Sequence, residues 1–358
     1  MRNAIKLVVV TVVFAFGALV FVFNRSDAQV PTAGQKFKNI KVLNDMPADQ
    51  LGKVMNLFAA SLNVDCSFCH NTNDYSSDEK KEKATARKMI QMTMDINKAS
   101  FNGRTEVTCN TCHSGHEHPI SAPALWPAAD AAEIKQPEPK PTADQVLAKY
   151  RAALGKPDAI AKVTSRHITA TRVEPSGKTE PEDIWQSGQK LRVATTYSNN
   201  GKDVTIVNGF NGTDAWIWSS AGPINPNPDD LTTVKRSAQV LFNPDLAGVY
   251  SKADYRFTDQ IDGRPVYLLT GTIAPNQAER LYFDVETGLL VRRAYTVRTF
   301  IGPFVYQWDY SDYKDFGGVK IPTTIKFAQP GVRFTRKITK VKINAPITDS
   351  SVFSEPKK

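Results

Sequence analysis

Two short stretches of the chain, VDCSFCHN at residues 64–71 and VTCNTCHS at 107–114, carry the same pattern of two cysteines and a histidine. Two residues separate the cysteines, and the histidine directly follows the second one. This spacing is the attachment signal of c-type haem, in which both thiols bond covalently to the porphyrin and the histidine ligates the iron. The motifs use all 4 cysteines of the chain, so the sequence predicts two covalently bound haem c groups.

Two other uses of paired cysteines remain as alternatives. A zinc ribbon joins two CxxC pairs, but its spacer is usually shorter than the one here, and zinc needs no histidine after each pair. A dithiol redox switch normally lies in a βαβ unit, and no such pattern surrounds either motif. The haem interpretation assigns thioether attachment to Cys66, Cys69, Cys109 and Cys112, and proximal iron ligation to His70 and His113.

A helix is expected directly before the first motif. Residues 45–63 carry apolar side chains at helical spacing, and Met55 lies in the middle of this stripe. Asp45 is a suitable N-cap, and Pro47 is tolerated in a first turn. The first motif therefore follows the end of an amphipathic helix.

A second helix is expected from about Ser76, since Ser76 and Glu79 have the spacing of a capping box. Met89 and Met92 share the apolar face of this helix. The second motif follows it, so residues 37–118 form an approximate internal repeat of helix and CxxCH.

The sixth ligand of each iron is expected to be either a histidine or a methionine, and methionine raises the potential of a cytochrome c. His116 and His118 are expected in a solvated loop, and His167 in a strand with a structural role. Met55 and Met89 hold equivalent places before the two motifs. From spacing alone, each is either an iron ligand or a core residue, because methionine also fills irregular gaps.

The stretches FKNIKVLNDMPADQLGKVMNLFAASLNVDCSFCHN and ATARKMIQMTMDINKASFNGRTEVTCNTCHSGHEHP resemble the first half of the photosynthetic reaction-centre cytochrome c subunit, over about residues 37–119. That family binds four haems in two paired halves. The resemblance implies that Met55 and Met89 are sixth ligands, with Met92 the fallback for Met89. The second pair of haem sites is missing here, as is the histidine that serves a later haem, so the resemblance does not imply photosynthesis.

Four segments follow from composition: a signal peptide or anchor at 1–28, a dihaem domain at 29–118, a proline-rich linker at 119–141 and a β-rich domain at 142–358. In the last, Thr142 and Gln145 fit a capping box and Gly155 fits a helix end. Residues 228–240 are expected to be an inserted helix. Alternating stretches separated by turn signals predict antiparallel strands at 190–197, 203–210, 213–220, 264–273, 280–297, 304–313, 319–327 and 333–343.

The stretches GFNGTDAWIW, LYFDVETGLLVRR and YSDYKDFGGVKIPTTIKF resemble the LolA-like lipoprotein-carrier family. This resemblance implies an open antiparallel β-barrel with helices and a concave apolar face, so that the domain binds a hydrophobic ligand or docks a partner. The expected fold class is thus multidomain, a small mostly α domain followed by a mainly antiparallel β domain. Tyr306, Trp308 and Tyr310 share one strand face and are expected in the core.

Export is expected from the N-terminus, where Arg2 and Lys6 precede an uncharged apolar stretch at 7–23 and then a small-residue cleavage pattern. Either the segment is cleaved, or it tethers the protein to the inner membrane. The formal net charge of +9 is spread thinly over 358 residues. A nucleic-acid partner is therefore not expected.

The expected function is an exported, periplasmic dihaem cytochrome that relays single electrons between redox partner proteins. No catalytic residues are predicted, and the protein is expected to be an electron carrier and not an enzyme. Three alternatives stay open: a reaction-centre subunit proper, a lipid or quinone carrier with redox haems, and a dihaem peroxidase.

Overall fold

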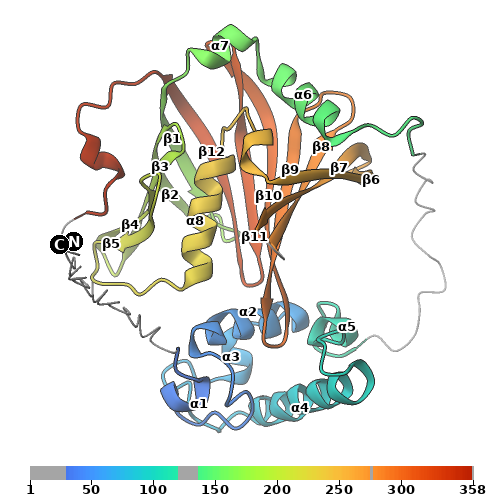
Figure 1. Ribbon diagram of the computed structural model, residues 1–358. Helices are drawn as coiled ribbons and strands as arrows, with labels where there is room; N and C mark the ends of the chain where they lie inside the picture. Colours follow the sequence, from blue (N-terminus) through green and yellow to red (C-terminus); the bar gives the residue numbers. More distant parts are fainter. Residues whose placement is uncertain (1–29, 120–135, 275–276, 357–358) are drawn as a thin grey trace, which may run out of the picture.

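The computed structural model describes residues 30–119, 136–274 and 277–356, which form a helical region and a β region (Figure 1). The expected signal or anchor, including residues 7–23, and most of the expected linker lie outside the described residues. Within the described residues, no helix has the length and apolarity needed to cross a membrane. The helical region consists of α1 (Ala33–Lys36), η1 (Ala48–Gln50), α2 (Leu51–Leu62), α3 (Cys66–Cys69), α4 (Lys81–Phe101) and α5 (Cys109–His113).

Both helices that precede the motifs are present, but their predicted starts are wrong. Pro47, and not Asp45, is the N-cap of the 3-10 turn that leads into α2. Lys80 is the N-cap of α4. Ser76 instead donates from its backbone N–H and its hydroxyl to Asp74, at 2.9 and 2.6 Å. Such local side-chain bonds compete with a helix, which explains why residues 74–79 stay a loop.

The β region is one antiparallel sheet, which confirms the predicted fold class of a mostly α part followed by a mainly antiparallel β part. Its strand order among the described residues is β5-β4-β3-β2-β1-β12-β11-β10-β9-β8-β7-β6, so the first and last strands in the chain pair at its centre and β5 and β6 are its edges. The strands are β1 (Ser165–Val173), β2 (Thr179–Ser187), β3 (Lys190–Asn199), β4 (Lys202–Phe210), β5 (Ala215–Ser219), β6 (Lys252–Ile261), β7 (Arg264–Ala274), β8 (Gln277–Asp284), β9 (Leu290–Thr299), β10 (Gly302–Phe316), β11 (Val319–Gln329) and β12 (Val332–Ile343).

Helices α6 (Ala143–Leu154), α7 (Pro157–Ala161) and α8 (Pro228–Val240) accompany this sheet. The predicted capping box of Thr142 and Gln145 is present at the start of α6, and Gly155 ends it. The inserted helix predicted at 228–240 is α8, which lies in front of one half of the sheet in the view of Figure 1. Leu147, Val234 and Phe304 belong to the large hydrophobic core that these helices share with the strands.

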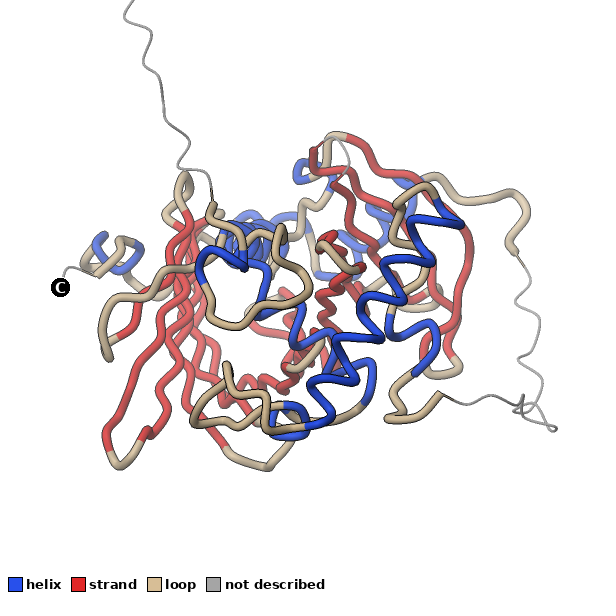
Figure 2. Tube along the Cα trace, turned by 90° about the horizontal axis from the view of Figure 1, so that it is seen from below, coloured by secondary structure: helices blue, strands red, loops and turns tan. Residues whose placement is uncertain are grey.

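The turn between β9 and β10 packs into the helical region. The backbone N–H of Phe300 donates to Gln50 Oε1 at 2.8 Å. Ile301 is buried in the hydrophobic cluster of the helical region, so a residue of the β region completes that cluster; the other buried members are Ala33, Leu43, Met46, Val54 and Ile90. Figures 1 and 2 both show the helical region lying against the strand ends of the sheet.

A second contact joins α2 to the start of α8. Lys53 is buried, and its ammonium donates to Asn227 Oδ1 at 2.7 Å and pairs with Asp229 at 3.1 Å. Asp229 lies in the first turn of α8, where a carboxylate also interacts favourably with the helix dipole. The helix that carries Met55 is therefore fixed to the helix that covers part of the sheet.

Candidate functional site

Each CxxCH motif forms a short helical turn of its own. α3 is capped by Asp65, whose side chain accepts from the backbone N–H of Ser67 at 2.9 Å. α5 is capped by a box between Thr108 and Thr111. In a helical turn, side chains three positions apart lie on the same face. The turn thus presents both cysteines of a motif on one side, as attachment to one porphyrin edge requires.

The histidines of the two motifs are held in the same way. Nδ1 of His70 lies 3.2 Å from the backbone oxygen of Tyr75, and Nδ1 of His113 lies 3.0 Å from that of His116. A ring nitrogen that donates to a carbonyl leaves the lone pair of Nε2 available to a metal. Burial lowers the pKa of His70, which favours the neutral imidazole that ligates iron. The same contact therefore fixes the tautomer of both histidines and leaves Nε2 of each as the nitrogen that could ligate a metal.

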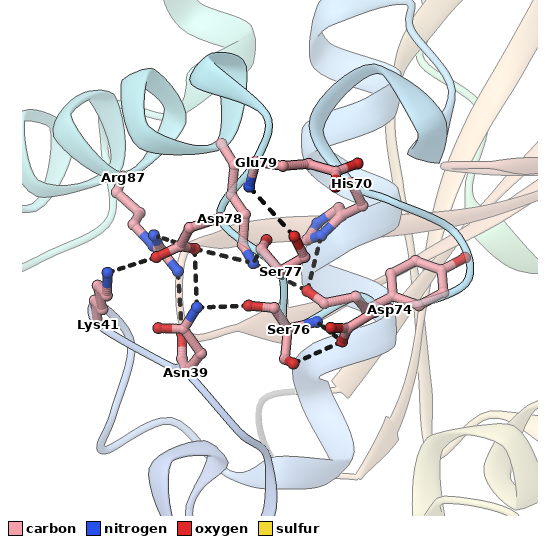
Figure 3. A network of polar contacts seen from close by, with 11 residues as sticks. Asn39, Lys41, His70, Asp74, Ser76, Ser77, Asp78, Glu79 and Arg87 are labelled. Atoms are coloured by element: carbon pink, nitrogen blue, oxygen red, sulfur yellow. Dashed lines mark hydrogen bonds and ion pairs between the residues drawn. The ribbon is translucent and has the colours of Figure 1, made fainter.

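A polar network fixes the loop that orients His70 (Figure 3). At its centre, the carboxylate of Asp78 accepts from Lys41 at 2.5 Å, Arg87 at 2.8 Å and Asn39 at 2.8 Å. The Lys41 ammonium, together with Arg87, holds the pKa of Asp78 well below its ordinary value. Because Asp78 is solvent-exposed, we assign these bonds to ordering of the loop and not to a large stabilisation.

Lys83 supports the same loop from α4. Its buried ammonium donates to the backbone oxygens of Tyr75 at 3.0 Å and Ser77 at 2.6 Å. The oxygen of Tyr75 is also the one that faces His70. Sequence reasoning missed both Lys83 and Asp78. The partners of Asp78 on the loop before α2, Asn39 and Lys41, are too far away in the sequence to reveal it, and Lys83 binds backbone oxygens, which no residue type indicates.

The segment that enters the second motif is held by Asn97, a buried residue of α4. Its amide donates to Val107 O at 2.7 Å, while its Oδ1 accepts from the N–H groups of Glu106 and Val107 at 3.1 and 2.9 Å. Behind the motif, the N–H of Gly115 donates to Ser61 O at 2.8 Å. Residues of both long helices therefore position α5. The sequence signal that could have indicated Asn97 is the presence of an asparagine on the apolar face of an amphipathic helix.

Each CxxCH turn contacts the long helix that precedes the other motif. α2 contacts α5, and α3 contacts α4. Each motif is thus braced by the helix that precedes the other motif, and both haem-attachment turns lie in one small unit. The three candidate methionines lie on these helices: Met55 is half-buried on α2, whereas Met89 and Met92 on α4 are 38% and 43% exposed.

The two alternative uses of the cysteines find no support here. Among the described residues, no group of three or more His, Cys, Asp and Glu side chains is arranged to hold a metal ion. Burial raises the pKa of the Cys69 and Cys109 thiols, whereas a reactive CxxC pair has a lowered thiol pKa. The donor set of two thiols and one oriented histidine in each motif fits haem c.

The remaining predicted residues lie where expected. His118 is exposed, and His167 in β1 stacks on Trp185 with ring centroids 4.0 Å apart and contacts Asp183 at 2.6 Å. Tyr306, Trp308 and Tyr310 of β10 are buried in the core. They also line a pocket of about 270 Å³ between α8 and the sheet.

Two oriented CxxCH turns on a small helical unit define a c-type cytochrome region. The family model described as photosynthetic reaction centre cytochrome C subunit matches residues 16–160. The predicted resemblance is therefore confirmed, and the match extends beyond residues 37–119 on both sides.

Curated relatives show the same similarity. The chain is 31% identical over 105 residues to the photosynthetic reaction center cytochrome c subunit of Roseobacter denitrificans, a stretch that is 25% of this chain and 28% of that protein. It is 34% identical over 83 residues to cytochrome c-554 of Chloroflexus aurantiacus, or 21% of this chain and 20% of that protein. The chain thus spans about a quarter of the length of the curated relatives it matches.

Among solved structures, a LolA superfamily protein from Nitrosomonas europaea aligns at 15% identity with a TM-score of 0.41 and covers 60% of this chain and 98% of that chain. An outer membrane lipoprotein-sorting protein domain from Vibrio parahaemolyticus aligns at 11% identity with a TM-score of 0.40 and covers 57% of this chain and 94% of that chain.

Proposed function

We propose that the protein is an exported dihaem c-type cytochrome that relays single electrons. The observation that carries this proposal is the repeated pairing of a CxxCH turn with a histidine whose Nδ1 faces a backbone oxygen. When bound, haem c supplies one-electron chemistry between ferrous and ferric iron. The chain attaches one haem through Cys66, Cys69 and His70, and the other through Cys109, Cys112 and His113. A periplasmic location and redox partners at the membrane follow from the same proposal.

We assign the sixth ligands to Met55 and Met89, with Met92 as the fallback for Met89. Met89 and Met92 are 38% and 43% exposed, which supports a role other than packing, because a core methionine is expected to be buried. Of the two, Met89 is assigned because its place before the second motif is equivalent to that of Met55 before the first. Met55 is supported by its place on α2, whose position is fixed by Lys53 and by the contact with α5. Methionine ligation favours a relatively high potential for both haems.

Replacing a methionine ligand by leucine is expected to abolish the methionine–iron charge-transfer band of one haem. Leucine keeps the volume of the side chain but has no sulfur. Met55→Leu and Met89→Leu are therefore expected to lose the band of different haems, as recorded in near-infrared absorption spectra of the oxidised protein. Met94→Leu is the matched control, since Met94 packs against the hydrophobic cluster. A band that survives Met89→Leu but is lost in Met92→Leu would move the ligand to Met92.

Lys83→Met is expected to lower the midpoint potential of the first haem only. The buried ammonium of Lys83 donates to the backbone oxygen of Tyr75, which also faces His70. Its positive charge therefore disfavours the additional positive charge of ferric iron. Removal of that charge favours the oxidised state. The measurement is a spectroelectrochemical titration, with Lys81→Met as control because the side chain of Lys81 is 92% exposed on the same helix. Equal shifts of both haems, or none, would contradict this role.

A narrower candidate is electron donation to a photosynthetic reaction centre, which the names of the curated relatives suggest. Flash-induced oxidation of this protein by isolated reaction centres would test it. A peroxidase function would instead need an open iron position, and ready carbon monoxide binding by the ferrous protein would favour it.

A second function is proposed for the β region, namely binding of a hydrophobic ligand. It is favoured by the pocket between α8 and the sheet, which is lined by Trp308, Phe327 and other apolar side chains. Lys53 of α2 contacts the start of α8, so the helix that covers this pocket is bound directly to the helix that carries Met55. A lipid or quinone carrier with redox haems would use both parts.

A further inference from the structure

A charge imbalance lies beside the pocket between α8 and the sheet, and Arg293 is its member in the pocket lining. Arg236 of α8 and Arg293 of β9 are both buried, and they share a single buried carboxylate, that of Glu279. Arg236 Nε donates to Glu279 at 3.0 Å, whereas Arg293 Nε lies 3.9 Å from it. The group therefore carries two positive charges and one negative charge. A buried charge without a partner is strongly unfavourable, so this cluster is expected to attract an anion.

Arg293 lines the pocket and has hydrogen-bond donors that are not used by the described residues. It is 1% exposed, and within the described part of the chain its Nη2 has no hydrogen-bond partner. Its guanidinium lies 4.0 Å from the ring centre of Trp308, which fixes its plane against the pocket wall. The hydroxyl of Tyr306, a residue that is 2% exposed and also lines the pocket, likewise has no partner in the described residues.

Two other groups of charged residues border the pocket. Arg336 donates to both carboxylate oxygens of Glu182, so that pair is neutral. Asp230, at the α8 end of the lining, shares the ammonium of Lys53 with Asp229, at 3.8 and 3.1 Å, so that group carries one net negative charge. Among the described charged residues of the lining, Arg293 is the one whose guanidinium keeps donors without a hydrogen-bond partner. The rest of the wall is apolar, with Leu191, Val193 and Ile325 among its aliphatic members.

We propose that this pocket binds an amphiphile with a single oxyanion head, which is held by Arg293 and Tyr306, and an aliphatic chain that lies along the apolar wall. This inference deepens the ligand proposal for the β region and does not depend on the haems. A carboxylate or a phosphate head has the same recognition chemistry, since each accepts charge-assisted hydrogen bonds from a guanidinium.

Isothermal titration of the full-length protein with ligands of one chain length tests the head group. Octanoate is expected to bind ~10- to 100-fold more tightly than octanol, the range that a hydrogen bond to a charged group provides. Octyltrimethylammonium is expected not to bind. Octyl phosphate distinguishes the two head groups, and tight binding of either anion supports the proposal. Affinities of the wild type for both anions that do not exceed its affinity for octanol, or binding of neither anion, overturn it.

Arg293→Met tests the residue. It is expected to abolish the preference for octanoate over octanol while the haem content stays unchanged, which separates this result from any failure of electron transfer. The variant is expected to fold, because Arg236 and Glu279 remain as a balanced pair. Arg292→Met is the matched control: Arg292 pairs with Asp309 at 2.6 Å and is not part of the pocket lining. Tyr306→Phe is expected to weaken octanoate binding several-fold, as loss of one bond would. An equal loss of preference in Arg292→Met contradicts the assignment.

Discussion

Replacing both cysteines of one motif is expected to remove one haem and to leave the other attached. Cys109→Ala with Cys112→Ala should lower the haem content from two per chain to one, and Cys66→Ala with Cys69→Ala should have the same effect. The reason is that each pair is proposed to form the thioether bonds of its own haem, and the pairs begin two separate helical turns, α3 and α5. The pyridine haemochrome assay, normalised to protein, measures the content, and the intact mass identifies the motif that is modified.

The matched control for this experiment is Ser67→Ala. Ser67 lies between the two cysteines of the first motif and bonds to the Asp65 cap, but it has no part in the thioether bonds. Its replacement should leave two haems per chain. A wild-type protein with one haem or none, or a double-cysteine variant that still carries two, would contradict the dihaem interpretation. Because each motif is braced by the helix before the other one, the remaining haem is expected to show a shifted potential.

Glu279→Gln is expected to destabilise the β region by about 3–5 kcal/mol, the usual cost of removing one partner from a buried ion cluster. Glu279 is fully buried and is the counter-ion of both Arg236 and Arg293, and it also accepts from the hydroxyl of Tyr250 at 2.7 Å. Without its charge, two guanidinium groups remain uncompensated in the core. The expected fall of the midpoint is on the order of 10 °C for a unit of this size. Thermal and urea unfolding followed by circular dichroism measure it.

Glu286→Gln provides the matched control, since Glu286 is exposed in the turn after β8 and its replacement should change stability by less than about 0.5 kcal/mol. The pH dependence gives a second check. Burial by itself raises the pKa of Glu279, but Arg293 and Arg236 outweigh it and hold that pKa below its ordinary value. A carboxyl with a lowered pKa stabilises the fold above its unfolded pKa, and this stabilisation is lost as the pH falls through the folded pKa. The wild type should show this acid-side loss, and Glu279→Gln should lack it.

Secondary structure was predictable where the local pattern is strong. The strands around residues 190–197 and 319–327 alternate clearly, and the helix at 228–240 has Asn227 as its cap and a proline in its first turn. β2 and β6 were not among the predicted strands. In β2, the sequence TEPEDIWQS contains a proline and three acidic residues, which disfavour a strand prediction. Glu182 of β2 is nevertheless buried, since Arg336 of β12 donates to it at 2.9 Å. An ion pair between residues so distant in the sequence has no local signal.

The sequence by itself determined which chemistry is proposed for this protein. Thioether attachment needs two cysteines and a histidine at fixed spacing, all within one helical turn, so Cys66, Cys69 and His70 can be recognised without any tertiary information. The same holds for the second motif. It also determined that helices precede the motifs and that an antiparallel β region follows.

Only the tertiary structure decided how the sites are held. The loop that orients His70 depends on Asp78 meeting Lys41, and the cluster of the helical region is completed by Ile301 from the β region. The excess charge at Arg293 exists because α8, β8 and β9 bring two arginines to one glutamate. Such contacts join residues that are far apart in the chain, and their energies depend on burial, which no local pattern of residues encodes.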